Sequence, residues 1–191
     1  MEFDARFPAD YDCEVLEELP NRSSPRWYFP GGTAVGGRAG LIVRVQPNLG
    51  DEWVGVFAFG DVSMRGVSAV LSMPGPRQLC VVSRGAGYIV DAASAREIEE
   101  ISMTPILGIM PVPAKALLLM HDYSRVRAYG RDGLAWSTPA ISWDGIEIQE
   151  VTDTALRGTG WDSPNNKHVP FAIDLATGGH EGGASPELLG E

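Results

Sequence analysis

Three histidines and their acidic neighbours are the residues of this chain best suited to chemistry. His121 and Asp122 stand where an apolar run ends in a polar turn, His121-Asp122-Tyr123-Ser124. An imidazole beside a carboxylate suits acid–base chemistry near neutral pH, and a loop would present both groups to solvent. Adjacent residues on a strand point to opposite faces, however, and Asp is a common turn residue. Both interpretations stay open at this point, and we favour the turn.

A second polar loop runs from Trp161 to His168 and reads Trp-Asp-Ser-Pro-Asn-Asn-Lys-His. Its oxygen-bearing side chains suit a hard cation, but their spacing matches no EF-hand and is also ordinary turn chemistry. His168 and His180 form no His-x-His or His-x-x-x-His pair, so a metal site would need assembly from distant segments. We therefore predict no metal and no cofactor. The residues we expect to form a binding site are His121, Asp122, Tyr123, Trp161, Asp162 and His168.

Motifs for a catalytic nucleophile or for phosphate binding are missing from the sequence. The Gly-x-Ser-x-Gly and P-loop lysine patterns do not occur. The glycine-rich segment Gly31–Gly37 lacks a lysine and precedes a strand-like run, so we interpret it as a turn. Tryptophan is the remaining signal, because it buries a large area and is over-represented at binding surfaces. The five tryptophans are Trp27, Trp53, Trp136, Trp143 and Trp161.

Charge and composition limit the kinds of partner. The formal net charge is −10, and the basic residues are scattered singly, which argues against nucleic acid. Residues 1–19 hold seven acids against one base, which indicates a frayed arm or one that docks on a basic partner. Cys13 and Cys80 suit a reducing cytosol of bacterial type. The first residues lack the features of a signal peptide, and no apolar run is long enough to span a membrane.

Short apolar runs between turn clusters indicate an all-β fold with many antiparallel strands. The segment 92–101 fits either a short helix with a capping box over 94–97 or a charged edge strand over 96–101, and we favour the strand. Asp144-Gly145 predicts a type I′ hairpin across 140–151, and Cys13 to Leu19 predict a short N-terminal helical turn. The runs that we expect to be strands are 41–45, 53–59, 67–71, 78–83, 88–90 and 169–175.

Three segments, 67–101, 106–136 and 146–178, share a layout of strands, turns and a closing polar run. The run Tyr129-Gly130-Arg131-Asp132-Gly133-Leu134-Ala135-Trp136 resembles blades of β-propellers of the quinoprotein or tryptophan-docking kind. The run Ile173-Asp174-Leu175-Ala176-Thr177-Gly178 is similar to their turns between strands. The resemblance implies a small or partial propeller, with room for about four blades. No quinone-binding residues match. A two-sheet sandwich is the alternative.

The predicted organisation is an acidic, irregular segment over 1–40, one antiparallel β domain over 41–179 and a disordered tail over 180–191. We predict a non-catalytic, cytoplasmic interaction protein, a monomer or homodimer, that binds another protein. A basic partner, of the kind that immunity proteins bind, is one option. The alternative function is a hydrolase or ligand-binding enzyme whose site lies in the loops around 121–123 and 161–168.

Overall fold

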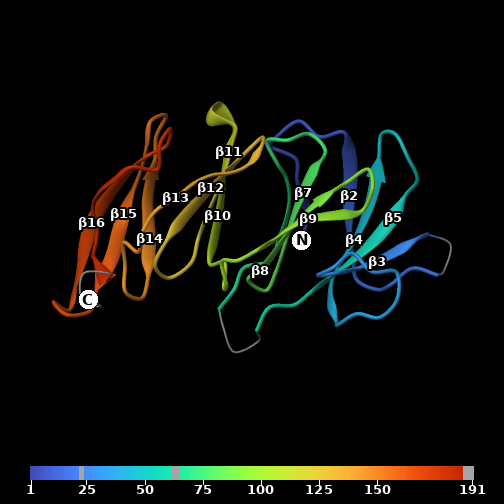
Figure 1. Cartoon of the computed structure of the whole chain (residues 1–191), viewed down its shortest axis with the longest axis horizontal. Helices are drawn as coiled ribbons and strands as arrows, with labels where there is room; N and C mark the ends of the chain where they lie inside the picture. The colour runs from blue at the N-terminus through green and yellow to red at the C-terminus, as the bar shows by residue number, and fades with distance from the viewer. Residues whose placement is uncertain (22–23, 62–64, 187–191) are drawn as a thin grey trace. The chain divides into compact units, whose positions relative to one another are not determined.

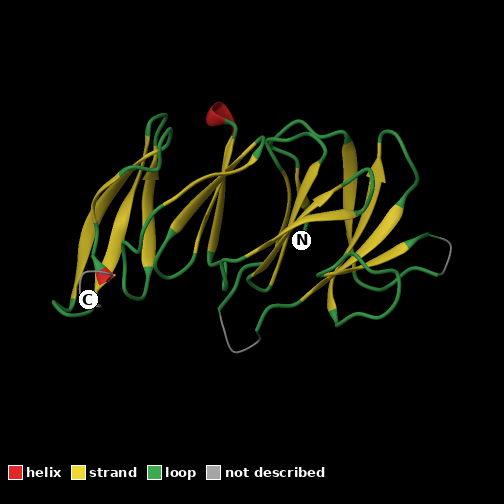
Figure 2. Ribbon diagram, viewed as in Figure 1, coloured by secondary structure: helices red, strands yellow, loops and turns green. Residues whose placement is uncertain are grey.

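The computed structural model describes residues 1–21, 24–61 and 65–186, and strands dominate its secondary structure (Figure 1, Figure 2). The chain forms two compact units, Met1–Ile106 and Leu107–Glu191. Each unit contains two sheets whose strands are mostly antiparallel. The all-β prediction is therefore confirmed.

The first unit contains a four-stranded and a five-stranded sheet. The four-stranded sheet has the order β2 (Tyr11–Leu16), β4 (Gly40–Pro47), β5 (Trp53–Ala58) and β3 (Arg26–Phe29). The five-stranded sheet has the order β1 (Phe3–Asp4), β6 (Ala69–Ser72), β7 (Gln78–Ser83), β8 (Ala86–Asp91) and β9 (Arg96–Ile101). β3 is parallel to β5, and β1 is parallel to β6. Every residue of β5 is buried, which explains its unbroken apolar sequence.

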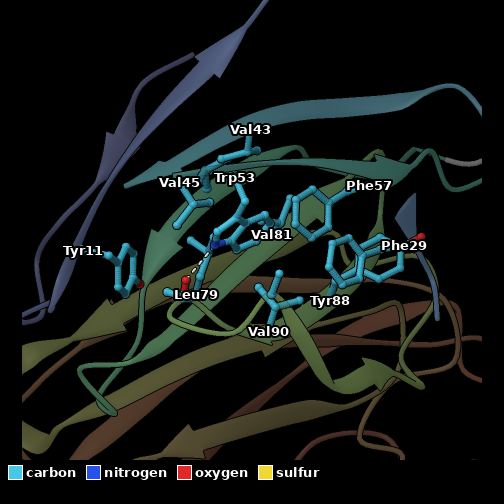
Figure 3. Close-up of a cluster of buried hydrophobic side chains, with 13 residues drawn as sticks. Tyr11, Phe29, Val43, Val45, Trp53, Phe57, Leu79, Val81, Tyr88 and Val90 are labelled. Atoms are coloured by element: carbon cyan, nitrogen blue, oxygen red, sulfur yellow. Dashed lines mark hydrogen bonds between the residues drawn. The ribbon is translucent and has the colours of Figure 1, made fainter. Parts of the chain in front are cut away.

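The core of the first unit consists of buried side chains from both of its sheets (Figure 3). Phe29 and Phe57 stack with ring centroids 4.6 Å apart, and Tyr88 packs on Phe57 at 5.7 Å. The Trp53 indole N–H donates to the carbonyl of Ala92 at 2.7 Å, the dashed line in Figure 3. Aromatic pairs of this kind add about 0.5–1.5 kcal/mol beyond their buried area, so ring packing contributes to the stability of this core.

The second unit contains two four-stranded sheets. The first has the order β10 (Gly108–Val112), β11 (Leu117–His121), β12 (Val126–Gly130) and β13 (Gly133–Ser137). A 3-10 turn, η1 (Pro113–Lys115), joins β10 to β11. The other has the order β14 (Ile146–Val151), β15 (Ala155–Asp162), β16 (Lys167–Asp174) and β17 (His180–Gly182). Aliphatic side chains from both sheets form its core, together with Trp136 and Phe171.

The predicted N-terminal helical turn is wrong, because Tyr11–Leu16 form strand β2. Tyr11 is buried and Cys13 and Val15 are half-buried, whereas Asp12 and Glu14 between them are exposed. This two-residue alternation is the strand period. Pairing with β4 along the whole of β2 also supplies backbone partners that an isolated helical turn would lack.

The predicted domain boundaries also differ from the structure. Residues of the expected arm belong to the first unit, where Phe7 is buried and its N–H donates to Ser72 Oγ at 3.0 Å. At the other end, His180–Gly182 form β17 and pair with Phe171–Ile173 of β16 instead of being disordered. Residues 187–191 of the expected tail lie outside the described residues. Two units replace the single domain predicted over 41–179.

The predicted hairpin over 140–151 does not form. Asp144-Gly145 lies in a bend, and Gly145 has φ +138°, whereas a type I′ turn needs positive φ at both central residues. β14 pairs instead with β15, and the turn between them is closed by Thr152 Oγ1, which accepts from the Ala155 N–H at 3.0 Å. The long partner strand thus prevails over the local turn signal.

Other predictions from the sequence agree with the structure. Residues 96–101 form the edge strand β9, as favoured over the helix. The segments 67–101, 106–136 and 146–178 each supply most of one sheet. The fourth sheet, built from strands between residues 11 and 58, was not recognised as a further copy. The resemblance to tryptophan-docking propellers stays a prediction.

Candidate functional site

His121 ends β11 and is held by its neighbours on both sides of the ring. It pairs with Gly108 of β10, where a Cβ atom would lie 2.2 Å from the imidazole Nε2. Glycine therefore makes room for this ring. The Nδ1 atom lies 3.0 Å from the carbonyl oxygen of Asp122. Burial lowers the pKa of His121 and outweighs the opposite effect of Asp122, which favours a neutral imidazole at neutral pH.

The carboxylate of Asp122 accepts hydrogen bonds within the turn that follows. Its Oδ1 accepts hydrogen bonds from the backbone N–H groups of Ser124 and Arg125, both at 2.7 Å, and from Ser124 Oγ at 3.2 Å. This is an Asx-type turn, in which the side chain replaces a backbone partner. The turn interpretation of His121-Asp122 therefore has direct geometric support.

The structure brings the loop at 121–124 and the start of the loop at 161–168 together through the bend at 141–145. The N–H of Gly145 donates to the Tyr123 carbonyl at 2.9 Å, and the N–H of Trp161 donates to the Gly145 carbonyl at 3.0 Å. The N–H of Trp143 donates back to the Trp161 carbonyl at 2.8 Å. Fully buried Ser142 completes the link, since its Oγ donates to Gly145 O at 2.6 Å and accepts from Trp161 N at 2.9 Å.

The loop after Trp161 makes its own local contacts. The rings of Trp161 and His168 meet edge to face with centroids 5.1 Å apart, across a register pair of β15 and β16. Asp162 Oδ2 accepts from Asn165 Nδ2 at 2.7 Å, which closes the turn. His168 thus contacts an indole, whereas His121 contacts a backbone carbonyl. The two histidines share no partner in these contacts.

Trp143 and Asp144 belong to this site, although the sequence placed them in a hairpin. The Trp143 side chain is 36% exposed, and Asp144 is exposed beside it. The available signal was a tryptophan directly before an Asp-Gly pair, because Asp and Gly favour turns and turns lie at the surface. We call Tyr123, Trp143, Trp161 and His168 the aromatic loop cluster.

Within the described residues, no three or more His, Cys, Asp or Glu side chains gather in a way that could hold a metal ion. The same residues include no helix long and apolar enough to cross a membrane. Burial raises the pKa of Cys80 to about 12 and also raises that of Cys13, so neither thiol has the acidity of a reactive cysteine.

No family model matches the chain, and no curated protein matches it. Among solved structures, one described as a crystal structure of the eukaryotic initiation factor is similar, with a TM-score of 0.39 and 12% sequence identity. The match covers 76% of this chain, and the chain spans only 40% of the length of that structure. A TM-score of this size does not establish a shared fold, so nothing about function follows from it.

Proposed function

We propose that this chain is a non-catalytic protein-binding module, and that the aromatic loop cluster of its second unit contacts a basic protein partner. The observation that carries the proposal is the exposed indole of Trp143 on a bend tied to both neighbouring loops. Tryptophan and tyrosine dominate the binding energy of protein interfaces, because one rigid side chain buries a large area.

The cluster is supported from beneath. Backbone hydrogen bonds join Tyr123, Gly145 and Trp161, and the buried Ser142 hydroxyl bridges two of these segments. A surface whose loops are already fixed loses little conformational entropy on binding. The arrangement therefore favours a preformed contact surface.

The charge around the cluster favours a basic partner. Asp144 directly follows Trp143 in the chain and is exposed, and Asp162 directly follows Trp161 and is half-buried. The whole chain carries a formal charge of −10. Carboxylates steer cationic partners during encounter, and indole faces attract Lys and Arg side chains. Aromatic rings next to carboxylates suit Arg-rich and Lys-rich surfaces.

The same geometry gives the enzyme alternative little support. A general base needs a carboxylate or imidazole that is available to substrate, but Asp122 Oδ1 accepts three hydrogen bonds within its own turn. His121 lies against Gly108 and contacts a backbone carbonyl. These partners are what a structural turn requires, which supports the non-catalytic proposal.

Trp143→Ala tests the proposal directly. The full chain, immobilised, captures partners from a cell extract at low and at moderate salt, and quantitative mass spectrometry compares the variant with the parent. Loss of a central interface tryptophan costs at least about 2 kcal/mol, so we expect retention of a specific partner to fall about 30-fold. Leu134→Ala, at a side chain that is 50% exposed in β13, is the matched control.

Charge is tested with a second matched pair. Asp144→Asn and Asp132→Asn both neutralise an exposed acid that precedes a glycine, but only the first lies in the cluster. We expect Asp144→Asn to weaken capture at low salt and Asp132→Asn to leave it unchanged. Equal capture by the parent and Trp143→Ala, or no retained protein at either salt concentration, would contradict the proposal.

A further inference from the structure

We propose that the first unit holds a separate binding pocket for an apolar carboxylate, anchored by Arg77. The pocket has a volume of about 520 Å³, within the range of small-molecule sites. Tyr11, Leu49, Ala92 and Ala93 line it with apolar surface. This site does not depend on the aromatic loop cluster, which belongs to the other unit.

The walls of the pocket are fixed by hydrogen bonds from different parts of the unit. The N–H of Asp10 donates to Pro76 O, and the N–H of Asn48 donates to Asp10 O, both at 2.8 Å. The N–H of Ala92 donates to Arg77 O, also at 2.8 Å. The phenol of Tyr11 donates to Gln78 O at 2.7 Å, which orients its ring. A pocket with such walls is formed before any ligand arrives.

Arg77 lines the pocket and has donors to spare. Its Nη2 contacts both carboxylate oxygens of Asp91, at 3.1 and 2.9 Å, and this holds the side chain in place. Its Nε and Nη1 donate to no group among the described residues, and 60% of the side chain is exposed. A guanidinium held by one carboxylate can bind a second through its remaining edge, because its donors form a planar fork.

The second unit forms the equivalent turn and hairpin without an arginine or a leucine at these two positions. The equivalent turn is closed by Leu175 N–H to Thr154 O at 2.9 Å, with threonine in the place of Arg77. The hairpin before Trp136 ends in Asp132-Gly133, whereas the one before Trp53 ends in Leu49-Gly50. Leu49 is 87% exposed, so its side chain is available to a ligand in the pocket. Both residues suit a ligand with an apolar body and a carboxylate.

Asp10 is exposed at the same pocket and helps to decide whether the ligand is a simple acid or an amino acid. The Asp10 carboxylate would repel the carboxylate of a simple acid, but it would attract the ammonium group of an amino acid. Two probes therefore share the proposed chemistry: hexanoate, which has no ammonium, and leucine, which has one. Binding of either supports the proposal, and tighter binding of leucine identifies the amino acid as the better ligand.

The experiment titrates the ¹⁵N-labelled full chain with hexanoate, leucine and 1-hexanol, and follows the amides of Leu49, Ala92 and Ala93 by NMR. We expect hexanoate or leucine to shift these amides, and 1-hexanol to bind at least about tenfold more weakly, since a hydrogen-bonded charge contributes on that order. Arg77→Gln should weaken the acid about tenfold or more. Arg131→Gln, the same change on an exposed hairpin of the second unit, should leave binding unchanged.

Two further variants guard against misfolding, because Arg77→Gln also removes the ion pair with Asp91. Arg77→Lys keeps the positive charge without the fork and should bind with intermediate affinity. Leu49→Ser alters an exposed side chain, so the fold should remain intact while affinity falls several-fold. Absence of shifts at the three amides, equal affinity for 1-hexanol and the acids, or unchanged affinity in folded Arg77→Gln would overturn the proposal.

Discussion

In the first unit, the indole N–H of Trp53 donates to Ala92 O at 2.7 Å, and in the second, that of Trp136 donates to Leu175 O at 3.0 Å. Donor and acceptor are 39 residues apart in both. Each tryptophan lies in one sheet of its unit and its acceptor follows the third antiparallel strand of the other sheet. The indole therefore joins two sheets, and the two units solve the same packing problem in the same way.

The turns that follow the two acceptors agree and then diverge. Asp91 Oδ1 accepts from the N–H and Oγ of Ser94, both at 2.9 Å. Asp174 Oδ1 accepts from the N–H and Oγ1 of Thr177, at 2.8 and 2.9 Å. The next residue is left-handed in both units, but it is an alanine at φ +55° in the first and Gly178 at φ +73° in the second.

The turn therefore requires a left-handed backbone at this position in both units. Whether the position holds alanine or glycine depends on how close the tryptophan ring lies. A Cβ atom on Gly178 would lie 2.7 Å from Trp136 Cγ, so an alanine there would collide with the indole. In the first unit Ala95 is buried and packs its methyl in the core. One unit gains a methyl contact, and the other gains close approach of its tryptophan.

The largest expected effect comes from removing either indole. We expect Trp53→Ala and Trp136→Ala each to lower the free energy of unfolding by about 3–5 kcal/mol, because both leave a cavity and an unpaired carbonyl. Exposed Trp143→Ala is the control and should cost less than about 1 kcal/mol. Urea unfolding followed by circular dichroism measures all three. If Trp136→Ala behaved like Trp143→Ala, the two units would not share a docking mechanism.

The sequence was sufficient for elements that local patterns determine. β7 was predicted with its actual bounds, because an apolar run between turn residues has one simple interpretation. The two Asp-Gly pairs show where this fails. Asp132 lies with Arg131 in a two-residue hairpin loop, and Gly133 pairs with Gly130 as the first residue of β13, whereas Asp144-Gly145 forms a bend. The dipeptides are identical, so the outcome was decided by the strands available to pair.

Long-range pairing explains what else the sequence could not reveal. β1 lies parallel to β6, with Phe3 opposite Val70, and no local pattern links such distant segments. At the candidate site, the turn role of Asp122 follows from its place before Ser124. The contact of that loop with Trp161 depends on Ser142 and Gly145, and it became visible only with the tertiary fold.

Substitutions at the two left-handed positions, Ala95 and Gly178, should have the second-largest effect on the free energy of unfolding. Gly178→Ala should lower the free energy of unfolding by about 2 kcal/mol or more, because it adds left-handed strain of about 1–2 kcal/mol and a clash with Trp136. Ala95→Gly relieves similar strain, but it loses a buried methyl and loosens the unfolded chain, so the change should stay within about 1 kcal/mol. Thermal unfolding compares the pair. A larger loss from Ala95→Gly than from Gly178→Ala would reverse our explanation of the divergence.

The smallest effect separates the two aspartates by pH and salt. Burial would raise the pKa of Asp91, but hydrogen bonds from Ser94 and Arg77 and the charge of Arg77 outweigh this effect and lower the pKa below its usual range. Hydrogen bonds from Thr177, chiefly from its side chain, lower the pKa of Asp174. A carboxyl with a depressed folded pKa stabilises the fold above its unfolded pKa, and that stability is lost as pH falls through the folded pKa. Stability should therefore decline below about pH 4 in the parent, and less steeply in Asp91→Asn and in Asp174→Asn.

Salt distinguishes the two contributions, because among the described residues Asp91 forms an ion pair, whereas the charge of Lys115 is the smallest of the causes that lower the pKa of Asp174. The Arg77 side chain of that pair is 60% exposed, so added salt weakens its attraction for the carboxylate. The difference in acid stability between the parent and Asp91→Asn should shrink as salt is added. The difference for Asp174→Asn should shrink much less, since short-range hydrogen bonds from Thr177 lower its pKa more than the charge of Lys115 does. Thermal midpoints measured across the acid range at low and high salt give both differences. Equal salt responses would mean that Arg77 adds nothing to the first turn, and the guanidinium would then owe its place beside Asp91 to some contact other than the ion pair.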